Sequence, residues 1–319
     1  MLIAINQQGE QVYAHRAKKQ DSYFCPHCSA QLLYKCGPKK IPHFAHKVDS
    51  VCYCAKQESE QHYFVKCFIA KMLSQLHYHV QIEPYCPTIQ QYPDILVNSK
   101  YVIEIQFSRI GIEEIIERTK AFKQLNMEVI WLIQDCRYHM GRLYLNSFQS
   151  HFIHPINRCL YVWKQKNKCV VLYSQIQHIG GRQFIAKQTV IKINELVNQI
   201  SIMPTPYQHI FKLTKSEIHY YLNQCRRKNS VLEPSLSAMY QLRLTDEAIY
   251  HNFGYIFPYQ LYIENHPVQW QLQFKLFNEQ ECDVHQRLKA FLKFRQMYLN
   301  TISMDCVVSE LINHYIKYS

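Results

Sequence analysis

Two carboxylates and an amide on neighbouring short segments form the most informative chemical pattern in this 319-residue chain. Asp94 opens the apolar run 94–97, and Glu104 and Gln106 alternate within the β-rich run 101–107. Side chains two apart on a strand share a face, and a neighbouring strand can bring Asp94 to the same point. Carboxylate oxygens suit a hard divalent cation such as Mg²⁺, which also binds substrate phosphate. The pattern therefore predicts a metal centre for phosphodiester hydrolysis.

An ordinary structural role for these residues is the alternative. Glu104 would then be a solvent-facing strand residue, and Pro93-Asp94 would be a turn. Both acids, however, lie among Ile, Val and Tyr, and acidic residues are depleted in strands. The alternative must explain two such misfits close together, which favours the metal centre.

A helix is predicted before these strands, because residues 55–73 carry apolar residues at helical spacing. Glu58, His62 and Lys66 are four residues apart and share one stripe of that helix. Glu60 lies about 200° around the helix from Glu58. Glu58 is therefore preferred over Glu60 as the acid that faces the same way as His62.

Periodicity also predicts the remaining elements of this region. An alternating strand, an amphipathic helix and a strand buried on both faces are expected at residues 79–83, 112–122 and 129–133. The expected order is helix, three strands, helix, strand.

This order, with Pro-Asp on one strand and Glu-x-Gln on the next, resembles the PD-(D/E)XK nuclease core. Over roughly the first 135 residues, the motifs and their order also resemble the competence protein CoiA family of naturally transformable Gram-positive bacteria. The motifs that carry the resemblance are residues 23–28, residues 43–46, Glu58 with His62 and Lys66, Pro93-Asp94, residues 104–108, Arg118 and Trp131.

The resemblance implies roles for the residues of the centre. Asp94 and Glu104 would bind Mg²⁺ or Mn²⁺, Glu58 or His62 would be the contribution of the helix, and Gln106 stands where related nucleases have lysine. Glutamine can orient a water molecule but cannot neutralise developing charge, so the metal would have to supply that electrostatic work.

Cysteine and histidine pairs near the N-terminus match the ligand types of a structural zinc site. Cys25 and Cys28 are followed, after fourteen residues, by His43 and His46. Two thiolates and two imidazoles can hold zinc tetrahedrally and leave no open position for catalysis. The thiols that could replace a histidine are those of Cys36, Cys52 and Cys54. The alternative is a small β-subdomain that packs without metal around Phe44.

Positive charge is concentrated after the expected core. The net charge is +12, and residues 136–200 carry nine Lys and Arg against one acidic residue, with Tyr and Trp interleaved. Cations can hold phosphates and rings can stack on bases, so this segment predicts DNA contact. The candidate DNA-contacting residues are Lys66, Arg118, Arg158, Lys164, Lys166, Lys168, Arg182 and Lys187. For the basic segment, a solvated charged face is the alternative. For Arg118, the family resemblance implies a side chain that points toward the centre, and a salt bridge to Glu114, one turn back, is equally plausible.

Four segments are expected from changes in composition and periodicity. They are a small Cys/His subdomain at 1–54, an αβββαβ core at 55–135, a basic β-rich extension at 136–203 and a mostly helical domain at 204–319. The resemblance implies that the core is restriction-endonuclease-like. Within the extension, Gly180-Gly181 is expected to be a turn between strands rather than a phosphate loop.

The family resemblance implies a DNA-processing role in natural transformation. We expect a Mg²⁺-dependent nuclease that acts on single-stranded or branched DNA during RecA-mediated recombination of incoming strands. A non-catalytic DNA-binding factor that uses the nuclease fold as a scaffold is the alternative. The first ten residues lack a signal-peptide pattern and no apolar run reaches transmembrane length, so a cytoplasmic protein without membrane insertion is expected.

Overall fold

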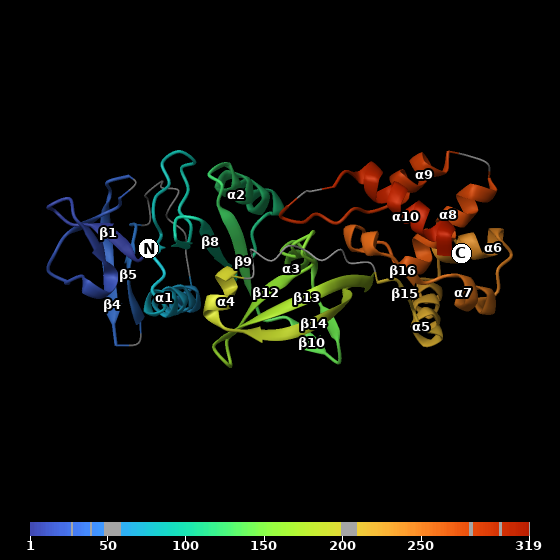
Figure 1. Ribbon diagram of the computed structural model, residues 1–319, viewed down its shortest axis with the longest axis horizontal. Coiled ribbons are helices and arrows are strands. Elements are labelled where there is room, and N and C mark those ends of the chain that lie inside the picture. Colours follow the sequence, from blue (N-terminus) through green and yellow to red (C-terminus); the bar gives the residue numbers. More distant parts are fainter. Residues whose placement is uncertain are drawn as a thin grey trace. The chain divides into compact units, whose positions relative to one another are not determined.

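The computed structural model describes residues 1–26, 28–38, 40–47, 59–198, 209–280, 283–299 and 302–318. The chain forms two compact units. Figure 1 shows the helices and strands coloured along the sequence. The first unit contains residues Met1–Asp135, Tyr161–Val171 and Val190–Ile202. The second contains Cys136–Leu160, Leu172–Thr189 and Met203–Ser319.

The N-terminal part of the first unit is a small antiparallel sheet with the strand order β2-β1-β3-β4-β5. Its strands are β1 (Ile3–Ile5), β2 (Gln11–Tyr13), β3 (Tyr23–Phe24), β4 (Gln31–Gly37) and β5 (Lys40–Ala45). Phe44 is 1% exposed, and its ring centroid lies 4.8 Å from that of Tyr23. The sheet therefore has an aromatic core of its own, with Phe44 inside it as the sequence indicated.

The next part has the element order that the sequence predicted. It comprises α1 (Glu60–Gln75), β6 (Val80–Ile82), β7 (Ile95–Val97), β8 (Tyr101–Gln106), α2 (Ile112–Gln124) and β9 (Glu128–Gln134). β7 pairs antiparallel with both β6 and β8, and β8 pairs parallel with β9. β9 continues in parallel to β12 (Leu160–Lys164). This part is a mixed α/β layer in which α2 packs on β9 (Figure 1).

Local chemistry explains where these elements begin and how they pack. The Ser59 side chain accepts a hydrogen bond from the His62 amide and so caps the N-terminus of α1. The residues of β9 from Val129 to Ile133 are all buried, as expected for a strand covered on both faces. α1 is covered on two sides, since it packs on β6 and β8 while Phe68 meets Trp163 of β12 edge-on.

The second unit combines strands with helices. β10 (Arg137–His139), β11 (Arg142–Tyr144), β14 (Gln183–Ile191) and β13 (Cys169–Gly180) are neighbours in that order. β13 and β14 each have residues in both units. The turn between them contains Gly181 at φ +56°, which confirms the predicted turn at Gly180-Gly181.

Helices dominate the rest of the second unit. They are α5 (Lys215–Arg226), α6 (Pro234–Gln241), α7 (Asp246–Asn252), α8 (Pro267–Glu279), α9 (Val284–Phe291) and α10 (Met304–Tyr318). The shorter elements are α3 (Ser147–Ser150), the strand pair β15 (Phe211–Lys212) and β16 (Tyr255–Ile256), and a 3₁₀ helix at Pro258–Tyr262; α4 (Ile193–Asn198) belongs to the first unit. Trp270 and Phe257 are fully buried in the core of the second unit.

Within the described parts of the chain, no helix has both the length and the apolar character needed to cross a bilayer.

Candidate functional site

The structure brings Asp94 and Glu104 together in the first unit. Asp94 directly precedes β7, and Glu104 lies on the adjacent strand β8. The Asp94 amide donates to Oε1 of Glu104 over 3.3 Å, and the Ile105 amide donates to Oδ2 of Asp94 over 2.8 Å. Both side chains line one cavity of about 390 Å³, together with His62 and Gln106.

The Asp94 carboxylate is held by two side chains of α1. Nζ of Lys66 lies 2.8 Å from Oδ1 and Nε2 of His62 lies 3.2 Å from Oδ2. Burial alone would raise the pKa of Asp94, but the charges and hydrogen bonds of Lys66 and His62 outweigh it. They hold the pKa of Asp94 well below its usual range, so the carboxylate is ionised at neutral pH.

Lys66 also binds a second carboxylate. Its Nζ donates to Oε1 of Glu83 over 2.7 Å, and Glu83 directly follows β6. Lys66 is fully buried, so it has no surface on which to meet DNA. The structure thus corrects the predicted DNA contact of Lys66: this lysine supports Asp94 from the protein interior.

Glu104 is held in a similar way by α2. Nη2 of Arg118 lies 2.5 Å from Oε2 of Glu104, and the guanidinium also donates to Oε1 of Gln91 and to the carbonyl of Tyr92. Although burial opposes its charge, Glu104 raises the pKa of Arg118. Arg118 is only 7% exposed and points to the centre, rather than making a surface salt bridge to Glu114 or a DNA contact.

The remaining candidates of the centre differ in their placement. The Gln106 amide donates to the carbonyl and hydroxyl oxygens of Ser108, over 2.7 and 3.2 Å, and so stabilises the turn after β8. His62 lines the cavity with its ring 6.0 Å from that of Phe107. Glu58 lies outside the described residues.

The donor types of the centre fit a hard divalent cation. Asp94 and Glu104 supply one carboxylate from each of two adjacent strand segments, and Mg²⁺ sites in proteins often use one or two such groups. The same oxygens accept from Lys66 and Arg118, so a bound cation would share them with two fixed positive charges. Charge already balanced in this way lowers the affinity for a metal but keeps the carboxylates in a fixed geometry.

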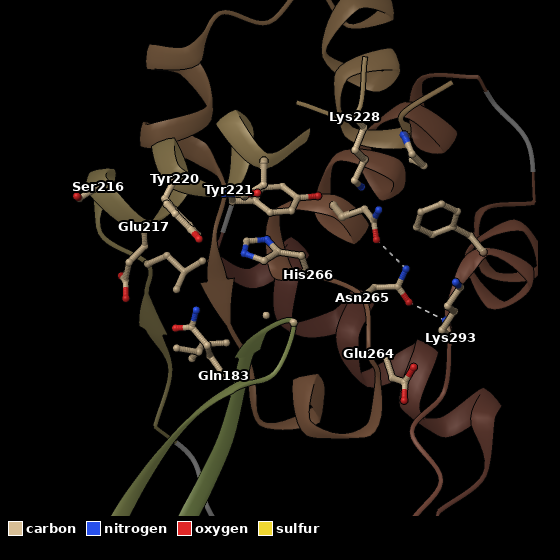
Figure 2. A pocket seen from close by; sticks show the side chains of 18 residues that line it. Gln183, Ser216, Glu217, Tyr220, Tyr221, Lys228, Glu264, Asn265, His266 and Lys293 are labelled. Carbon is tan, nitrogen blue, oxygen red and sulfur yellow. Dashed lines mark hydrogen bonds between the residues drawn. The ribbon is translucent and has the colours of Figure 1, made fainter. Parts of the chain in front are cut away.

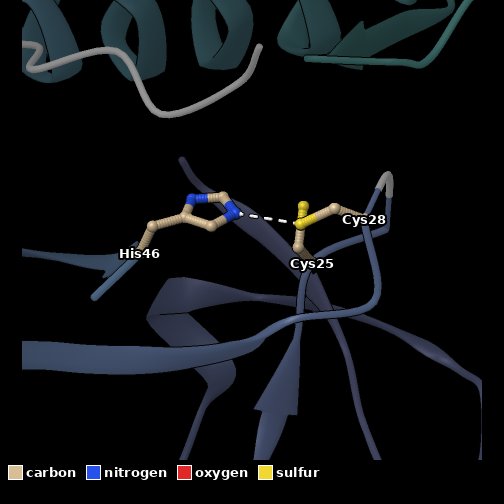
Figure 3. A group of neighbouring side chains, drawn as sticks. All are labelled: Cys25, Cys28 and His46. Carbon is tan, nitrogen blue, oxygen red and sulfur yellow. Dashed lines mark hydrogen bonds between the residues drawn. The ribbon is translucent and has the colours of Figure 1, made fainter. Parts of the chain in front are cut away.

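A second group of ligand-type side chains lies in the small sheet (Figure 3). Cys25 and Cys28 follow β3, and His46 follows β5; their ligand atoms all lie within 4.8 Å of one another. Nε2 of His46 is 3.4 Å from Sγ of Cys28. Two thiols and one imidazole at this spacing suit zinc.

His43 does not join this group. Its Nδ1 lies 2.9 Å from the Ile41 carbonyl, and its ring stacks on Tyr63 with centroids 5.2 Å apart. The prediction of His43 as a zinc ligand is therefore corrected, because its own strand and α1 fix its ring elsewhere. Of the proposed substitutes, Cys36 is exposed on β4, and Cys52 and Cys54 lie outside the described residues.

The other predicted DNA-contacting cations divide by exposure. Arg158 is 8% exposed and donates to the Pro258 carbonyl, so its predicted DNA contact is also corrected. Lys164 lies 3.0 Å from Asp135. The cations that remain exposed are Lys166 and Lys168 in the first unit and Arg182 and Lys187 in the second.

The sequence did not identify Glu83 as part of the centre. One signal pointed to it: Lys66 lies three and seven residues before Ile69 and Leu73, so it falls on the buried face of α1. A buried ammonium requires a carboxylate partner. The identity of that partner depends on tertiary packing, which the spacing does not reveal.

Comparisons with known proteins identify the family. The family model described as "Competence protein CoiA, N-terminal domain" matches residues 6–55, and that described as "Competence protein CoiA, nuclease-like domain" matches residues 58–205. The competence protein CoiA of Bacillus subtilis (strain 168) is 33% identical over 119 residues, covering 36% of this chain and 32% of that relative. The match thus spans about a third of the relative's length, and no solved structure matches. The chain belongs to the competence protein CoiA family.

Proposed function

We propose that this protein is a metal-dependent deoxyribonuclease of natural competence, with a PD-(D/E)XK core in residues 55–135. One observation carries the proposal: Asp94 and Glu104 converge on one cavity from adjacent strand segments. The family model over this region is named for a nuclease-like domain, and the relative is named a competence protein. Both names support a role in processing DNA during transformation.

The chain's own residues would divide the work as follows. When bound, a Mg²⁺ or Mn²⁺ ion would supply the positive charge that phosphodiester hydrolysis requires. Asp94 and Glu104 would hold that ion, with Lys66 and Arg118 fixing their carboxylates. The His62 imidazole is hydrogen-bonded to Asp94, and its neutral form would take a proton from the attacking water.

DNA is the proposed substrate, and incoming single strands or branched recombination joints are the forms that fit a competence role. The exposed cations Lys166, Lys168, Arg182 and Lys187 are proposed to contact its phosphates. RecA is the partner that the family resemblance implies.

A DNA-binding accessory factor without catalysis is the second candidate, and the site itself favours it in one respect. Each carboxylate oxygen of Asp94 and Glu104 already accepts a hydrogen bond from a donor of the chain. Gln106, in the place of the usual lysine, donates to Ser108. A centre satisfied in this way can be a stable scaffold.

Cleavage assays with matched variants separate the two candidates. Wild-type protein, Asp94→Asn, Glu104→Gln and the control Glu113→Gln, whose side chain is exposed on α2, are incubated with single-stranded, duplex and branched DNA in Mg²⁺ or Mn²⁺. A nuclease predicts cutting by wild type and control, and a loss of at least about 100-fold in the two site variants with DNA binding retained. Metal-independent binding without cutting by the wild type would instead favour the accessory factor.

A further inference from the structure

The second unit contains a cavity of about 920 Å³ that the proposed nuclease chemistry does not use (Figure 2). Its volume is at the upper end of the range for small-molecule sites, roughly 300–1,000 Å³. Three parts of the unit line it: the β13–β14 turn, α5, and the start of α8 with the segment after α9. No motif in the sequence marked these residues as a group.

Aromatic rings form part of the cavity wall. Tyr221 and His266 stack face to face, with centroids 3.6 Å apart and planes 2° from parallel, and the Tyr221 hydroxyl is fixed by Ser235 at 2.5 Å. Tyr220, which precedes Tyr221 on α5, is 61% exposed and points into the cavity (Figure 2). Within the described chain, no other ring contacts Tyr220, so its face is available for stacking.

The β13–β14 turn is fitted closely to His266. Gly180 has φ +128°, and a Cβ built on it would lie 2.2 Å from Cδ2 of His266. Only glycine allows this backbone to approach the imidazole so closely. The turn therefore fixes the ring that backs the aromatic wall, and the cavity has a defined shape.

Polar side chains line the same space. Among the described residues, the half-buried side-chain amides of Gln183 and Gln224 form no hydrogen bond to another group of the chain. Oε1 of Gln269 accepts from Asn265 over 2.9 Å, which leaves the Gln269 amide nitrogen to donate. Nδ1 of His266 accepts from the Val268 amide, so the proton of the neutral ring is on Nε2. The cavity thus offers several donors and acceptors beside its rings.

The charges of the lining nearly cancel. Lys228 and Lys293 are matched in number by Glu217 and Glu264, and Lys228 and Glu217 also form ion pairs with Glu233 and Arg142, so the cavity does not select for a polyanion as such. A neutral, planar group with hydrogen-bonding edges is the ligand that fits aromatic faces and amides together. A nucleobase has this chemistry: amides pair with base edges, carboxylates accept from exocyclic amino groups, and rings stack on either face.

We propose that this cavity holds an unpaired nucleobase of single-stranded DNA, stacked on Tyr220, with its edge bonded to the glutamine amides and its phosphate near Lys228 or Lys293. This inference rests on the proposed function, because DNA is the substrate there. It adds a second point of contact in the other unit, one that reads the unpaired base and not only the backbone charge.

Binding of oligomers with and without bases tests the proposal. The full chain, in buffer without added Mg²⁺ or Mn²⁺ so that metal-dependent cutting is prevented while any zinc in the small sheet is retained, is titrated into fluorescent oligothymidylate and into a base-free sugar–phosphate oligomer of equal length and charge. We expect wild type to bind oligothymidylate at least tenfold more tightly. Tyr220→Ala should weaken that binding by roughly 5- to 150-fold, while Tyr220→Phe, which keeps the ring, restores it.

Tyr240→Ala is the matched control, since Tyr240 is 86% exposed on α6 and does not line the cavity. Equal binding of the two oligomers by wild type would overturn the proposal, as would equal effects of Tyr220→Ala and Tyr240→Ala. Cross-linking with 4-thiothymidine should modify residues 216–224 or 264–269, and cross-links confined to other segments would count against the cavity.

The outcome is independent of the nuclease test. Preference for bases without added Mg²⁺, together with no cutting when Mg²⁺ is added, would support the cavity and contradict the nuclease. Cutting in Mg²⁺ without a preference for bases would support the nuclease and contradict the cavity.

Discussion

The buried ammonium of Lys66 determines the geometry of the carboxylate centre. A charge without a partner in the protein interior is strongly destabilising, whereas one that is paired with good geometry is tolerated. Lys66 is paired with two carboxylates, those of Asp94 and Glu83, and Arg118 is paired with the carboxylate of Glu104. The two acids are therefore held in place before any ligand arrives, which is the preorganisation that an electrostatic centre needs.

Removing the Lys66 charge should destabilise the first unit. Lys66→Met keeps a similar volume but leaves Asp94 and Glu83 without their shared cation. We expect the free energy of unfolding, measured by urea denaturation at neutral pH, to fall by about 3–5 kcal/mol. The control Lys123→Met removes an exposed ion pair with Glu128 and should cost less than about 1 kcal/mol. Equal losses in both variants would contradict the role of Lys66.

The same pair predicts a dependence on pH. The pKa values of Asp94 and Glu83 are both lowered in the folded state, since the Lys66 charge outweighs the effect of burial. Their stabilisation is thus complete above the unfolded values, about pH 4, and is lost as the pH falls through the lowered folded values. In Lys66→Met, burial acts on these carboxyls without the Lys66 charge and raises their pKa relative to the wild type, so the variant regains stability as they take up protons. The difference between wild type and Lys66→Met should therefore be largest at neutral pH and shrink as the pH falls toward about 4.

At the scale of elements, the periodicity of the sequence predicted the order of helices and strands. It did not predict which residues are buried by contacts between distant segments. The order from α1 to β9 follows from periodicity, and β9 is buried on both faces as its apolar run indicated. The inward face of α1 was only partly identified. Of the apolar positions at helical spacing, Leu73 is buried but Phe64 and Phe68 are only half-buried. Lys66 and Ile69 are among the other buried residues. Because α1 packs on the sheet and also meets β12, the apolar pattern covers two faces and does not distinguish them.

Distant partners were not predictable from spacing either. Arg118 reaches Gln91 and the Tyr92 carbonyl, and His43 is turned away from zinc-type ligands by Ile41 and Tyr63. The cavity of the second unit is lined from several separate segments, so no local motif could mark it. The predicted division of the chain into four segments stays a prediction beside the two compact units described here.

The turn after β3 and the end of β5 should hold a zinc ion that links the central strand of the small sheet to its edge strand. We expect purified protein to contain one zinc per chain by elemental analysis, and Cys28→Ser to lose it, because a serine hydroxyl is a poor zinc ligand. Cys36→Ser and His43→Ala should retain the metal, since neither side chain belongs to the group.

Chelation extends this prediction to stability. Removing the metal should lower the melting temperature of the wild type and leave Cys28→Ser unchanged. Variants of Cys52 and Cys54 would show whether either thiol completes the coordination. Metal-free wild-type protein, or zinc retained by Cys28→Ser, would refute the site.

Across the whole molecule, the two units depend on opposite protonation states. The first relies on ionised carboxylates, while the second buries two neutral histidines. Burial, followed by the nearby charge of Arg295, holds the pKa of His178 well below its usual range. Burial lowers the pKa of His266 to about 3. His266 also caps α8 through Nδ1, where a proton would remove the acceptor and place positive charge at the positive end of the helix.

This difference predicts that mild acid weakens the second unit selectively. A histidine whose folded pKa is lowered stabilises fully above its unfolded value, about 6.5, and loses about 1.4 kcal/mol per pH unit below it. Two such residues give a loss of about 4 kcal/mol between about pH 7 and pH 5. Trp270 belongs to the second unit, and Trp131 and Trp163 belong to the first. The double variant Trp131→Phe/Trp163→Phe therefore reports the second unit alone, and Trp270→Phe reports the first, in urea titrations followed by fluorescence.

The slope of stability against pH, rather than the stability itself, identifies the histidines responsible. In the background that retains Trp270, His266→Asn keeps a capping acceptor for α8 but cannot titrate, so it should reduce the slope by about half. The control His219→Asn changes an exposed histidine on α5 that bonds Tyr250, and its slope should equal that of its parent. Parallel slopes for the two units, or an unchanged slope in His266→Asn, would show that the acid sensitivity does not arise from the histidines buried beside the cavity.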